Sequence, residues 1–361
     1  MKKILILANN DIGLYKFRKE IIQELIKEYK VFISLPYGEF IPKLEELGCE
    51  YIETSINRRG TNPLTDFKLF YKYKDIIKKI KPDVVLTYTI KPNVYGGMAC
   101  RMERVPYITN ITGLGSAIEN GGIMQRIGLF LYKTSLKKAS CVFFQNKENQ
   151  QFFRSMRVIE NNDRLIPGSG VNLNEYKLLD YPPDDKIHFL FIARIMKEKG
   201  IEQYLDAAKH IREKYQNTVF HILGFCEEAY ENRLKDMEDS GLIKYHGMQN
   251  DVRDFHQISH CTIHPTYYPE GMSNVLLESA ACGRPVITTN RSGCREIVDD
   301  TINGYIVEQQ NSQDLIDQIE KFIALDYEIK KKMGLASREK VEKEFDKKIV
   351  VKAYLDEIKK A

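Results

Sequence analysis

The sequence predicts an α/β protein made of two doubly wound parallel sheets. Its 361 residues are long for one domain and comfortable for two of about 150–180 residues. Short apolar runs alternate with helix-like segments, which is typical of parallel sheets. The alternation stops at the polar, proline-broken stretch Asp180–Asp185 and restarts at Ile187. We therefore expect domains at residues 1–180 and 181–345.

The first half alternates strands with amphipathic helices. The run Lys3–Ala8 is apolar and strand-sized, and the next helix turns Phe17, Ile21 and Leu25 to one face. Strands are expected at 3–8, 31–35, 49–53, 84–88, 107–111 and 141–144, and helices at 15–29, 39–47, 64–80, 92–103, 123–139 and 147–155. Ligands of such sheets lie at the carboxyl ends of the strands.

The second half repeats this pattern without repeating the sequence. The strand Ile187–Ala193 leads into a helix over 201–215, and the segment 345–360 reads as an amphipathic helix after the last strand. Further strands are expected at 218–223, 243–246, 261–264, 285–289 and 304–307, with helices between them.

Composition and charge narrow the possible functions. Residues 1–180 carry 28 Lys/Arg and 19 Asp/Glu, which gives a net charge of +9. Residues 181–361 carry 26 Lys/Arg and 31 Asp/Glu, which gives a net charge of −5. The basic half favours an anionic partner, yet no nucleic-acid-binding signature accompanies the charge. The seven cysteines form no Cys-x-x-Cys pair, which favours reduced thiols in a cytoplasm and no metal site. No apolar run is long enough to span a bilayer.

Several loops of the first half can meet an anion. Gly13 lies in the first strand-to-helix loop, where a backbone amide can approach a phosphate, although turn geometry alone also explains a glycine there. Three further strand-end loops are basic or glycine-rich, and ordinary loop chemistry is the alternative for each. The residues that we expect to contact an anionic ligand are Arg18, Arg58, Arg59, Lys91, Thr112 and Gly113. For Arg18, which falls on the helix after Gly13, a solvated helix face is the alternative.

The helix at 123–139 has two interpretations. Arg126, Lys133 and Lys137 share one face at helical spacing, beside Leu129 and Phe130. This arrangement fits contact with anionic lipid headgroups. A core helix with a charged outer stripe is the alternative.

The stretch 268–289 holds two carboxylates, Glu270 and Glu278, eight residues apart. Ser273 is placed to cap the helix that carries Glu278. Eight helical positions span about 12 Å, which is the scale of a sugar nucleotide from sugar to ribose. The amides of Gly271, Met272 and Ser273 would face an anion between the two carboxylates.

Two cations precede this stretch in the second half. Arg194 and Lys199 follow the strand Ile187–Ala193 and come just before a helix, where they can neutralise a leaving diphosphate. His246 ends a strand where a base could stack. The sequence contains no Asp-x-Asp, so we expect protein cations, and no metal, to compensate the charge.

These elements together resemble the GT-B glycosyltransferases of family 4 over nearly the whole chain. The Glu-x₇-Glu element runs from Glu270 to Glu278, and the Arg-x₄-Lys-Gly element from Arg194 to Gly200. The resemblance implies two Rossmann-like domains facing a cleft, with the C-terminal helix 346–361 packed back on the first domain. It implies a retaining, metal-independent transferase without a cofactor.

The resemblance also implies roles for the site residues. Arg194 and Lys199 would bind the diphosphate, and Glu270, the third catalytic residue, would contact the donor sugar. Glu278 would hold the ribose hydroxyls. The full donor-binding set is Gly13, Gly271, Met272, Ser273, Asn274, Glu278, His246 and Met248. One departure concerns Asn110-Ile-Thr112, because many family members have a histidine in this region.

A finer resemblance links the chain to bacterial galactosyl- and N-acetylgalactosaminyl-transferases that act on undecaprenyl-diphosphate sugars. It rests on Asn57–Pro63, Thr112–Ser116 and Gly168–Asn172. The expected reaction moves a hexose or N-acetylhexosamine from a nucleotide sugar to a lipid-diphosphate-linked saccharide. The nucleotide that we expect is UDP. The enzyme would be cytoplasmic and peripheral on the inner membrane face. The alternatives are a UDP-sugar epimerase of the same fold and a non-catalytic nucleotide-sugar-binding subunit.

Overall fold

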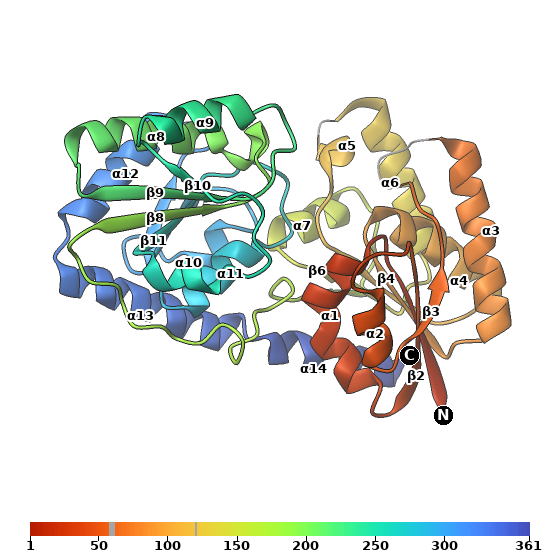
Figure 1. Ribbon diagram of the computed structural model, residues 1–361. Coiled ribbons are helices and arrows are strands. Elements are labelled where there is room, and N and C mark those ends of the chain that lie inside the picture. Colours follow the sequence, from red (N-terminus) through yellow and green to blue (C-terminus); the bar gives the residue numbers. More distant parts are fainter. Residues whose placement is uncertain (58–61, 120) are drawn as a thin grey trace. The chain divides into compact units, whose positions relative to one another are not determined.

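The computed structural model describes residues 1–57, 62–119 and 121–361, which form two compact units (Figure 1). Unit 1 comprises Met1–Gly170 and Lys347–Ala361, and unit 2 comprises Val171–Asp346. Each unit is a parallel sheet with helices on both faces. The prediction of two parallel-sheet α/β domains is thereby confirmed.

The described part of unit 1 contains seven parallel strands in the order β3-β2-β1-β4-β5-β6-β7. Its strands are β1 (Lys2–Leu7), β2 (Tyr29–Leu35), β3 (Glu50–Glu53), β4 (Val84–Tyr88), β5 (Tyr107–Ile111), β6 (Cys141–Phe144) and β7 (Asp163–Leu165). The short strand β7 was not expected from the sequence, because its residues Asp163 and Arg164 give no apolar signal. It pairs with β6 at the edge of the sheet.

Alternate residues of β1 enter the two cores of unit 1. Ile4 and Ile6 pack against one helical layer, and Leu5 and Leu7 against the other. The first layer holds α1 (Asp11–Leu25), α2 (Ile41–Glu46) and α14 (Lys347–Lys360). The second holds α3 (Pro63–Ile80), the π-helical turn η1 (Pro92–Gly96), α4 (Gly97–Glu103), α5 (Ser116–Glu119), α6 (Gly122–Leu136) and α7 (Lys147–Ser155).

Helix α1 begins four residues earlier than the hydrophobic period predicts. The side chain of Asn10 accepts a hydrogen bond from the amide of Gly13 at 2.6 Å and so caps the first turn. Such a cap satisfies one of the amides that a helix start leaves without a partner. Gly13 therefore lies inside α1 and not in a loop before it.

Helix α14 belongs to unit 1, although it follows unit 2 in the sequence. Tyr354 is buried, with its ring centroid 4.5 Å from that of Phe143 on β6. Its hydroxyl accepts a hydrogen bond from Asn110 Nδ2 at 2.6 Å. The ammonium of Lys347 lies 3.3 Å from Glu20 Oε2 on α1. These contacts make the C-terminal helix part of the unit 1 core.

The described part of unit 2 contains six parallel strands in the order β10-β9-β8-β11-β12-β13. They are β8 (Ile187–Ile192), β9 (Thr218–Leu223), β10 (Lys244–Tyr245), β11 (Cys261–His264), β12 (Val286–Thr289) and β13 (Gly304–Val307). One face carries α8 (Ile201–Lys214), α9 (Glu231–Asp239) and α12 (Ser312–Ala324). The other carries α10 (Arg253–Ile258), α11 (Asn274–Ala281) and α13 (Tyr327–Glu344). Two short 3₁₀ turns, η2 (Lys197–Lys199) and η3 (Arg295–Ile297), complete the unit.

The polar stretch at 180–185 is not a linker between the units. The buried guanidinium of Arg284 donates to the carbonyl of Asp180 at 2.7 Å, and the hydroxyl of Tyr181 donates to the carbonyl of His260 at 2.9 Å. The amide of Leu179 donates to Cys282. Because these bonds fasten the segment to unit 2, the unit begins at Val171, ten residues before the predicted boundary.

No described helix is both long and apolar enough to cross a bilayer. Helix α6 has fifteen residues, and four of its large apolar side chains are exposed: Ile123, Met124, Ile127 and Phe130. Its buried residues include Tyr132 and Leu136. The helix thus has a packed face and an exposed apolar face.

Unit 2 contains a ladder of imidazole rings across neighbouring strands. His188 Nδ1 lies 2.9 Å from His221 Nε2, and His221 Nδ1 lies 2.9 Å from His246 Nε2. Burial, together with the neighbouring His188, lowers the pKa of His221 to about 3. Burial also lowers the pKa of His256 to about 3 and that of His260 to about 4. These rings are therefore neutral at physiological pH.

Unit 2 should lose stability in mild acid. Each buried histidine is neutral when folded, whereas in the unfolded chain it takes a proton near pH 6.5. The free energy of unfolding is therefore unaffected by these rings above pH 6.5 and falls as the pH drops toward 4. At pH 5 the loss is about 2 kcal/mol for each ring that stays neutral in the folded state. Urea unfolding at pH 7 and pH 5 measures this loss.

His256→Leu provides the matched variant. Neither ring nitrogen of His256 has a hydrogen-bond partner among the described residues, so leucine should keep the stability at pH 7. The loss between pH 7 and pH 5 should shrink by about 2 kcal/mol. An unchanged loss would contradict the assignment of the acid sensitivity to buried imidazoles.

Candidate functional site

The strand order of unit 2 reverses between β8 and β11, which lie side by side. In open parallel sheets such a switch point opens a crevice at the carboxyl ends of the strands, where ligands bind. The loop after β8 carries Arg194 and Lys199, and the loop after β11 carries Glu270. The three residues predicted to be catalytic therefore converge on this switch point.

Gly200 shapes the first of these loops. Its φ of +80° lies in the left-handed region, and a Cβ there would meet the carbonyl oxygen of Pro265 at 2.1 Å. Only glycine combines this backbone angle with so close an approach. Gly200 therefore lets the loop after β8 and the loop after β11 touch.

The second loop is fastened to the first by one carbonyl. The oxygen of Glu198 accepts hydrogen bonds from the amides of Tyr267 and Tyr268, both at 2.9 Å. The ring of Tyr268 consequently lies under both cations, 4.5 Å from Lys199 Nζ and 5.2 Å from Arg194 Cζ. Such cation–π contacts hold the charged groups in place.

Each cation also pairs with a carboxylate. Lys199 Nζ hydrogen-bonds Glu270 Oε1, and Arg194 Nη1 hydrogen-bonds Glu227 Oε2. Burial favours a raised pKa for Glu270, but Lys199 outweighs it, so the pKa of this carboxyl lies below its usual value. Burial likewise opposes the charge on Arg194, and the hydrogen bond to Glu227 reverses this and raises its pKa. The site therefore presents a charged carboxylate and two charged cations.

His264 lies on β11 beneath this pair. Burial, together with the nearby charge of Lys199, lowers its pKa to about 4. Its ring nitrogens have no hydrogen-bond partner among the described residues. His264 is thus a neutral, packed side chain, as expected for a histidine on a buried strand. Across the described residues, no three His, Cys, Asp or Glu side chains gather into a metal-binding group.

The segment around Ser273 confirms the predicted helix cap but not the predicted contact of its amide with an anion. The side chain of Ser273 caps α11 by accepting from the amide of Leu276 at 3.5 Å. Its own amide donates to the carbonyl of Gly293 at 2.7 Å and so does not face an anion. Glu270 precedes the first helical residue by four positions, so the helical spacing of about 12 Å does not apply to the Glu270–Glu278 pair.

A hydrogen-bonded turn at residues 292–296 supports this segment. Glu296 accepts from the amide of Gly293 at 2.7 Å and from the hydroxyl of Ser292 at 3.1 Å. Gly293 has a φ of +88°, and a Cβ there would meet the carbonyl oxygen of Gly271 at 2.7 Å. The turn at residues 292–296 thus packs against the loop that carries Glu270.

The other residues of unit 2 predicted to bind the donor lie on or just before α11 and after β10. Glu278 lies on α11 and hydrogen-bonds Tyr176, whose pKa is raised by burial and by this carboxylate. Met272 is buried and Asn274 half-buried at the start of α11. His246 ends the imidazole ladder, and its ring centroid lies 4.7 Å from that of Phe255. Met248, beyond it, is 60% exposed.

Two predicted residues of unit 1 are occupied by the fold. The amide of Gly13 is taken by the Asn10 cap and is not available for a phosphate. Arg18 is buried, with its guanidinium 4.9 Å from the Tyr88 ring centroid and Nη1 donating to the carbonyl of Phe17. Arg18 therefore does not lie on a solvated helix face.

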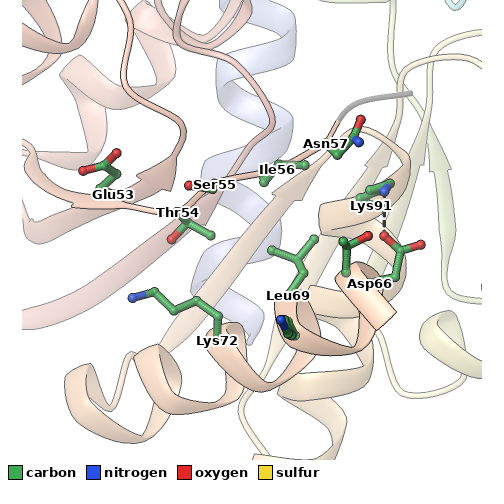
Figure 2. Close-up of a pocket in the computed structure, with 11 residues that line it drawn as sticks. Glu53, Thr54, Ser55, Ile56, Asn57, Asp66, Leu69, Lys72 and Lys91 are labelled. Atoms are coloured by element: carbon green, nitrogen blue, oxygen red, sulfur yellow. Dashed lines mark hydrogen bonds and ion pairs between the residues drawn. The ribbon is translucent and has the colours of Figure 1, made fainter. Parts of the chain in front are cut away.

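The other predicted acceptor residues lie at strand ends of unit 1. Lys91 Nζ pairs with Asp66 Oδ1 at 2.5 Å, at one side of a hollow of about 840 Å³ that Figure 2 shows. Thr112 and Gly113 follow β5 and are half-buried. Arg58 and Arg59 lie outside the described residues.

Glu227 and Tyr268 are the site residues that the sequence prediction missed. Glu227 follows β9, the neighbour of β8, and Tyr268 stands two positions before Glu270. Both therefore come from loops at the carboxyl ends of strands, which is a usable signal. Their contacts with Arg194 could not be inferred, because they depend on how three loops fold over one sheet edge.

The chain was compared with known proteins. The family Glycosyl transferases group 1 matches residues 181–340, and the family Glycosyl transferase 4-like matches residues 3–146. A Campylobacter jejuni protein named N,N'-diacetylbacillosaminyl-diphospho-undecaprenol alpha-1,3-N-acetylgalactosaminyltransferase is 26% identical over 97% of this chain and 96% of its own. An Escherichia coli UDP-Gal:alpha-D-GlcNAc-diphosphoundecaprenol alpha-1,3-galactosyltransferase is 24% identical over 72% of this chain and 71% of its own.

Solved structures share the fold. The crystal structure of Anabaena HepE in complex with UDP and glucose superposes with a TM-score of 0.82, 18% identity and full coverage of both chains. A glycosyltransferase from Rickettsia africae gives a TM-score of 0.80 at 20% identity, covering 99% of this chain and 98% of its own. The similarity to these structures extends over both units.

Gly200→Ala should disrupt the site. The new Cβ would need a left-handed backbone and would collide with the carbonyl of Pro265, so we expect the free energy of unfolding to fall by about 3 kcal/mol or more. Gly241→Ala is the control, because its φ is +75° yet a Cβ there has open space. Urea unfolding of both variants isolates the close approach, and equal losses would contradict it.

Proposed function

The chain belongs to the GT-B glycosyltransferases, with the group 1 and 4-like families covering its two units, and from this premise we propose its reaction. A hexose or N-acetylhexosamine moves from a nucleotide sugar to a saccharide carried on a polyprenyl diphosphate. The proposed nucleotide is UDP. The anomeric configuration of the sugar is retained and no metal ion takes part. The product serves the assembly of a surface polysaccharide.

One observation carries this proposal. Arg194, Lys199 and Glu270 converge at the switch point of unit 2, with the Tyr268 ring beneath both cations. Two cations and one carboxylate at such an edge suit a sugar diphosphate, whose phosphates need positive charge and whose sugar offers hydroxyls. In the structure the carboxylates of Glu227 and Glu270 occupy the two cations, and a diphosphate would take over part of these contacts.

The chemistry follows from the charges. The bond between the anomeric carbon and the leaving diphosphate breaks, and that diphosphate gains negative charge, which Arg194 and Lys199 stabilise. The acceptor hydroxyl attacks from the same face and gives its proton to the departing phosphate oxygen. Retention results without an enzymatic nucleophile.

Glu270 orients the donor in this scheme. Its lowered pKa keeps the carboxylate ionised, so it can accept hydrogen bonds from sugar hydroxyls and fix the anomeric carbon. Glu278, on the first turns of α11, would accept from the ribose hydroxyls. These roles are the ones that the Glu-x₇-Glu resemblance implies.

The relatives support the proposed substrates. Their names describe transfer to undecaprenyl-diphosphate saccharides in C. jejuni and E. coli, and one names a UDP-sugar as the donor. Anabaena HepE was crystallised with UDP-glucose. The two curated relatives named here are transferases, which favours transfer over epimerisation or a purely binding role. Product analysis without acceptor separates these functions, because an epimerase needs no acceptor.

The acceptor is membrane-bound, so we also propose peripheral contact with the inner face of the cytoplasmic membrane. Ile123, Ile127 and Phe130 expose apolar surface on α6, and Arg126 and Lys133 are exposed on the same helix. An apolar face with basic neighbours binds the interface of an anionic bilayer. The charged outer stripe of an ordinary core helix would not include these exposed apolar side chains.

Removing one charge from the site should abolish most of the transfer. For Glu270→Gln and for Lys199→Ala we expect kcat/KM to fall about 100-fold or more, since each group acts on the developing charge or on the sugar position. Transfer from a panel of UDP-sugars to extracted lipid-linked acceptor measures it. Lys197→Ala, an exposed lysine two residues away, is the control. Near-normal rates in both site variants would overturn the assignment.

Polar residues on α6 should weaken membrane binding. Ile127→Ser with Phe130→Ser removes two apolar side chains from the proposed contact, and we expect the affinity for anionic vesicles to fall about tenfold. Flotation with phosphatidylglycerol vesicles measures it. Ile302→Ser, at a 61% exposed residue of unit 2, is the control. Equal flotation of all three proteins would exclude this surface.

A further inference from the structure

We propose that the hollow beside β3 and α3 in unit 1 binds the diphosphate and first sugar of the lipid-linked acceptor, while the neighbouring apolar face of α3 lies in the bilayer interface. This inference rests on the proposed function and names its acceptor site. The hollow of about 840 Å³ lies between the segment after β3 and the first half of α3 (Figure 2). Pockets of 300–1,000 Å³ are the usual size for small-molecule ligands.

The walls of the hollow suit a phosphorylated sugar. Lys68 and Lys72 line it from α3 and form no ion pair among the residues that the structure describes. Ser55 and Thr65 add hydroxyl groups to the lining, and Leu69 adds an apolar side chain. The Thr65 hydroxyl donates to the carbonyl of Asn62 at 2.8 Å, so toward a sugar it can act as an acceptor. Two unpaired cations beside hydroxyl groups match a diphosphate with a saccharide attached.

The carboxylates nearby do not cancel this charge. Both oxygens of Asp66 are engaged, Oδ1 with Lys91 at 2.5 Å and Oδ2 with the hydroxyl of Tyr95 at 2.9 Å. Glu53 also lines the hollow, at the start of the segment 53–57 (Figure 2), and among the described residues it forms no ion pair with Lys68 or Lys72. Lys91, which the sequence analysis predicted to bind an anion, thus lines the hollow with its charge already paired with Asp66. Lys68 and Lys72 supply the available positive charge.

The exposed side of α3 explains why the ligand would be a lipid. Leu64, Phe67 and Tyr71 are 73%, 59% and 46% exposed. At 100° per residue they fall within an arc of about 60°, and Lys68 and Lys72 lie on the adjoining flank. The Phe67 and Tyr71 rings already pack edge to face at 4.7 Å. An anion-binding flank beside an apolar, aromatic flank matches an amphiphile whose head enters the hollow and whose chain stays in the membrane.

Helix α6, the membrane contact of the proposed function, belongs to the same helical layer. Both α3 and α6 pack against η1 and α4. Their exposed apolar side chains therefore come from one layer of unit 1. A membrane that contacts this layer presents its lipid-linked diphosphates beside the hollow.

Charge-matched variants test the site. The variant K68Q/K72Q removes two charges at the hollow, and K78Q/K79Q removes two from the last turn of the same helix. Flotation compares phosphatidylcholine vesicles that carry undecaprenyl-diphosphate N-acetylglucosamine with vesicles that carry phosphatidylglycerol. We expect K68Q/K72Q to lose at least tenfold in affinity for the first vesicles, whereas K78Q/K79Q loses less than threefold. Transfer kinetics should show the same rise in KM for the acceptor, with UDP binding unchanged.

Three results would overturn the proposal. Equal losses in the two double variants would indicate general electrostatic attraction, and a loss for phosphatidylglycerol as large as that for the diphosphate would indicate a phospholipid headgroup. An unchanged affinity in K68Q/K72Q would exclude the hollow. If the wild-type protein transfers no sugar from any donor, the proposed function fails instead, and the vesicle comparison still decides what the hollow binds.

Discussion

The candidate site depends on one ion pair, between Lys199 and Glu270 at the carboxyl edge of the unit 2 sheet. The two residues are 71 positions apart, and two strand-end loops must touch before they can meet. Gly200 permits that contact, and the carbonyl of Glu198 fastens Tyr268 beneath the cations. The pair is partly buried, and the charge of Lys199 holds the pKa of the Glu270 carboxyl below its usual value. Removing one partner would leave the other charge uncompensated, which is costly away from water. The fold thus places a cation and a carboxylate side by side, where a phosphorylated sugar could contact both.

A second layer of contacts keeps this edge rigid. Glu296 holds the turn at Gly293, and the carbonyl of Gly293 holds the amide of Ser273 at the start of α11. The loop of Glu270 is therefore braced from β8 on one side and from the turn after β12 on the other. Groups that act on developing charge need such preorganisation, because a site that must rearrange loses the benefit of its dipoles.

Unit 1 is built differently, and this suits a different ligand. Its predicted anion ligands are largely engaged by the fold: Gly13 by a helix cap, Arg18 by burial and Lys91 by Asp66. Among the described residues, exposed lysines and arginines without an ion-pair partner lie instead on the helices α3 and α6, which also expose apolar side chains. A nucleotide sugar arrives from solution and needs a braced crevice, whereas a lipid-linked saccharide arrives from a surface. We propose that the basic first half of the sequence serves the second case.

The sequence by itself determined the fold class and the two sheets, and it singled out three charged residues, Arg194, Lys199 and Glu270, that the structure brings together. Apolar runs of strand length and the fixed order of Arg194, Lys199 and Glu270 are local signals, and they survive folding unchanged. Tertiary structure alone decided which groups remain available. The amides of Gly13 and Ser273 and the ammonium of Lys91 are claimed by partners, and only packing identifies those partners. It also placed residues 171–185 in unit 2, because Arg284 reaches backbone carbonyls about a hundred positions away.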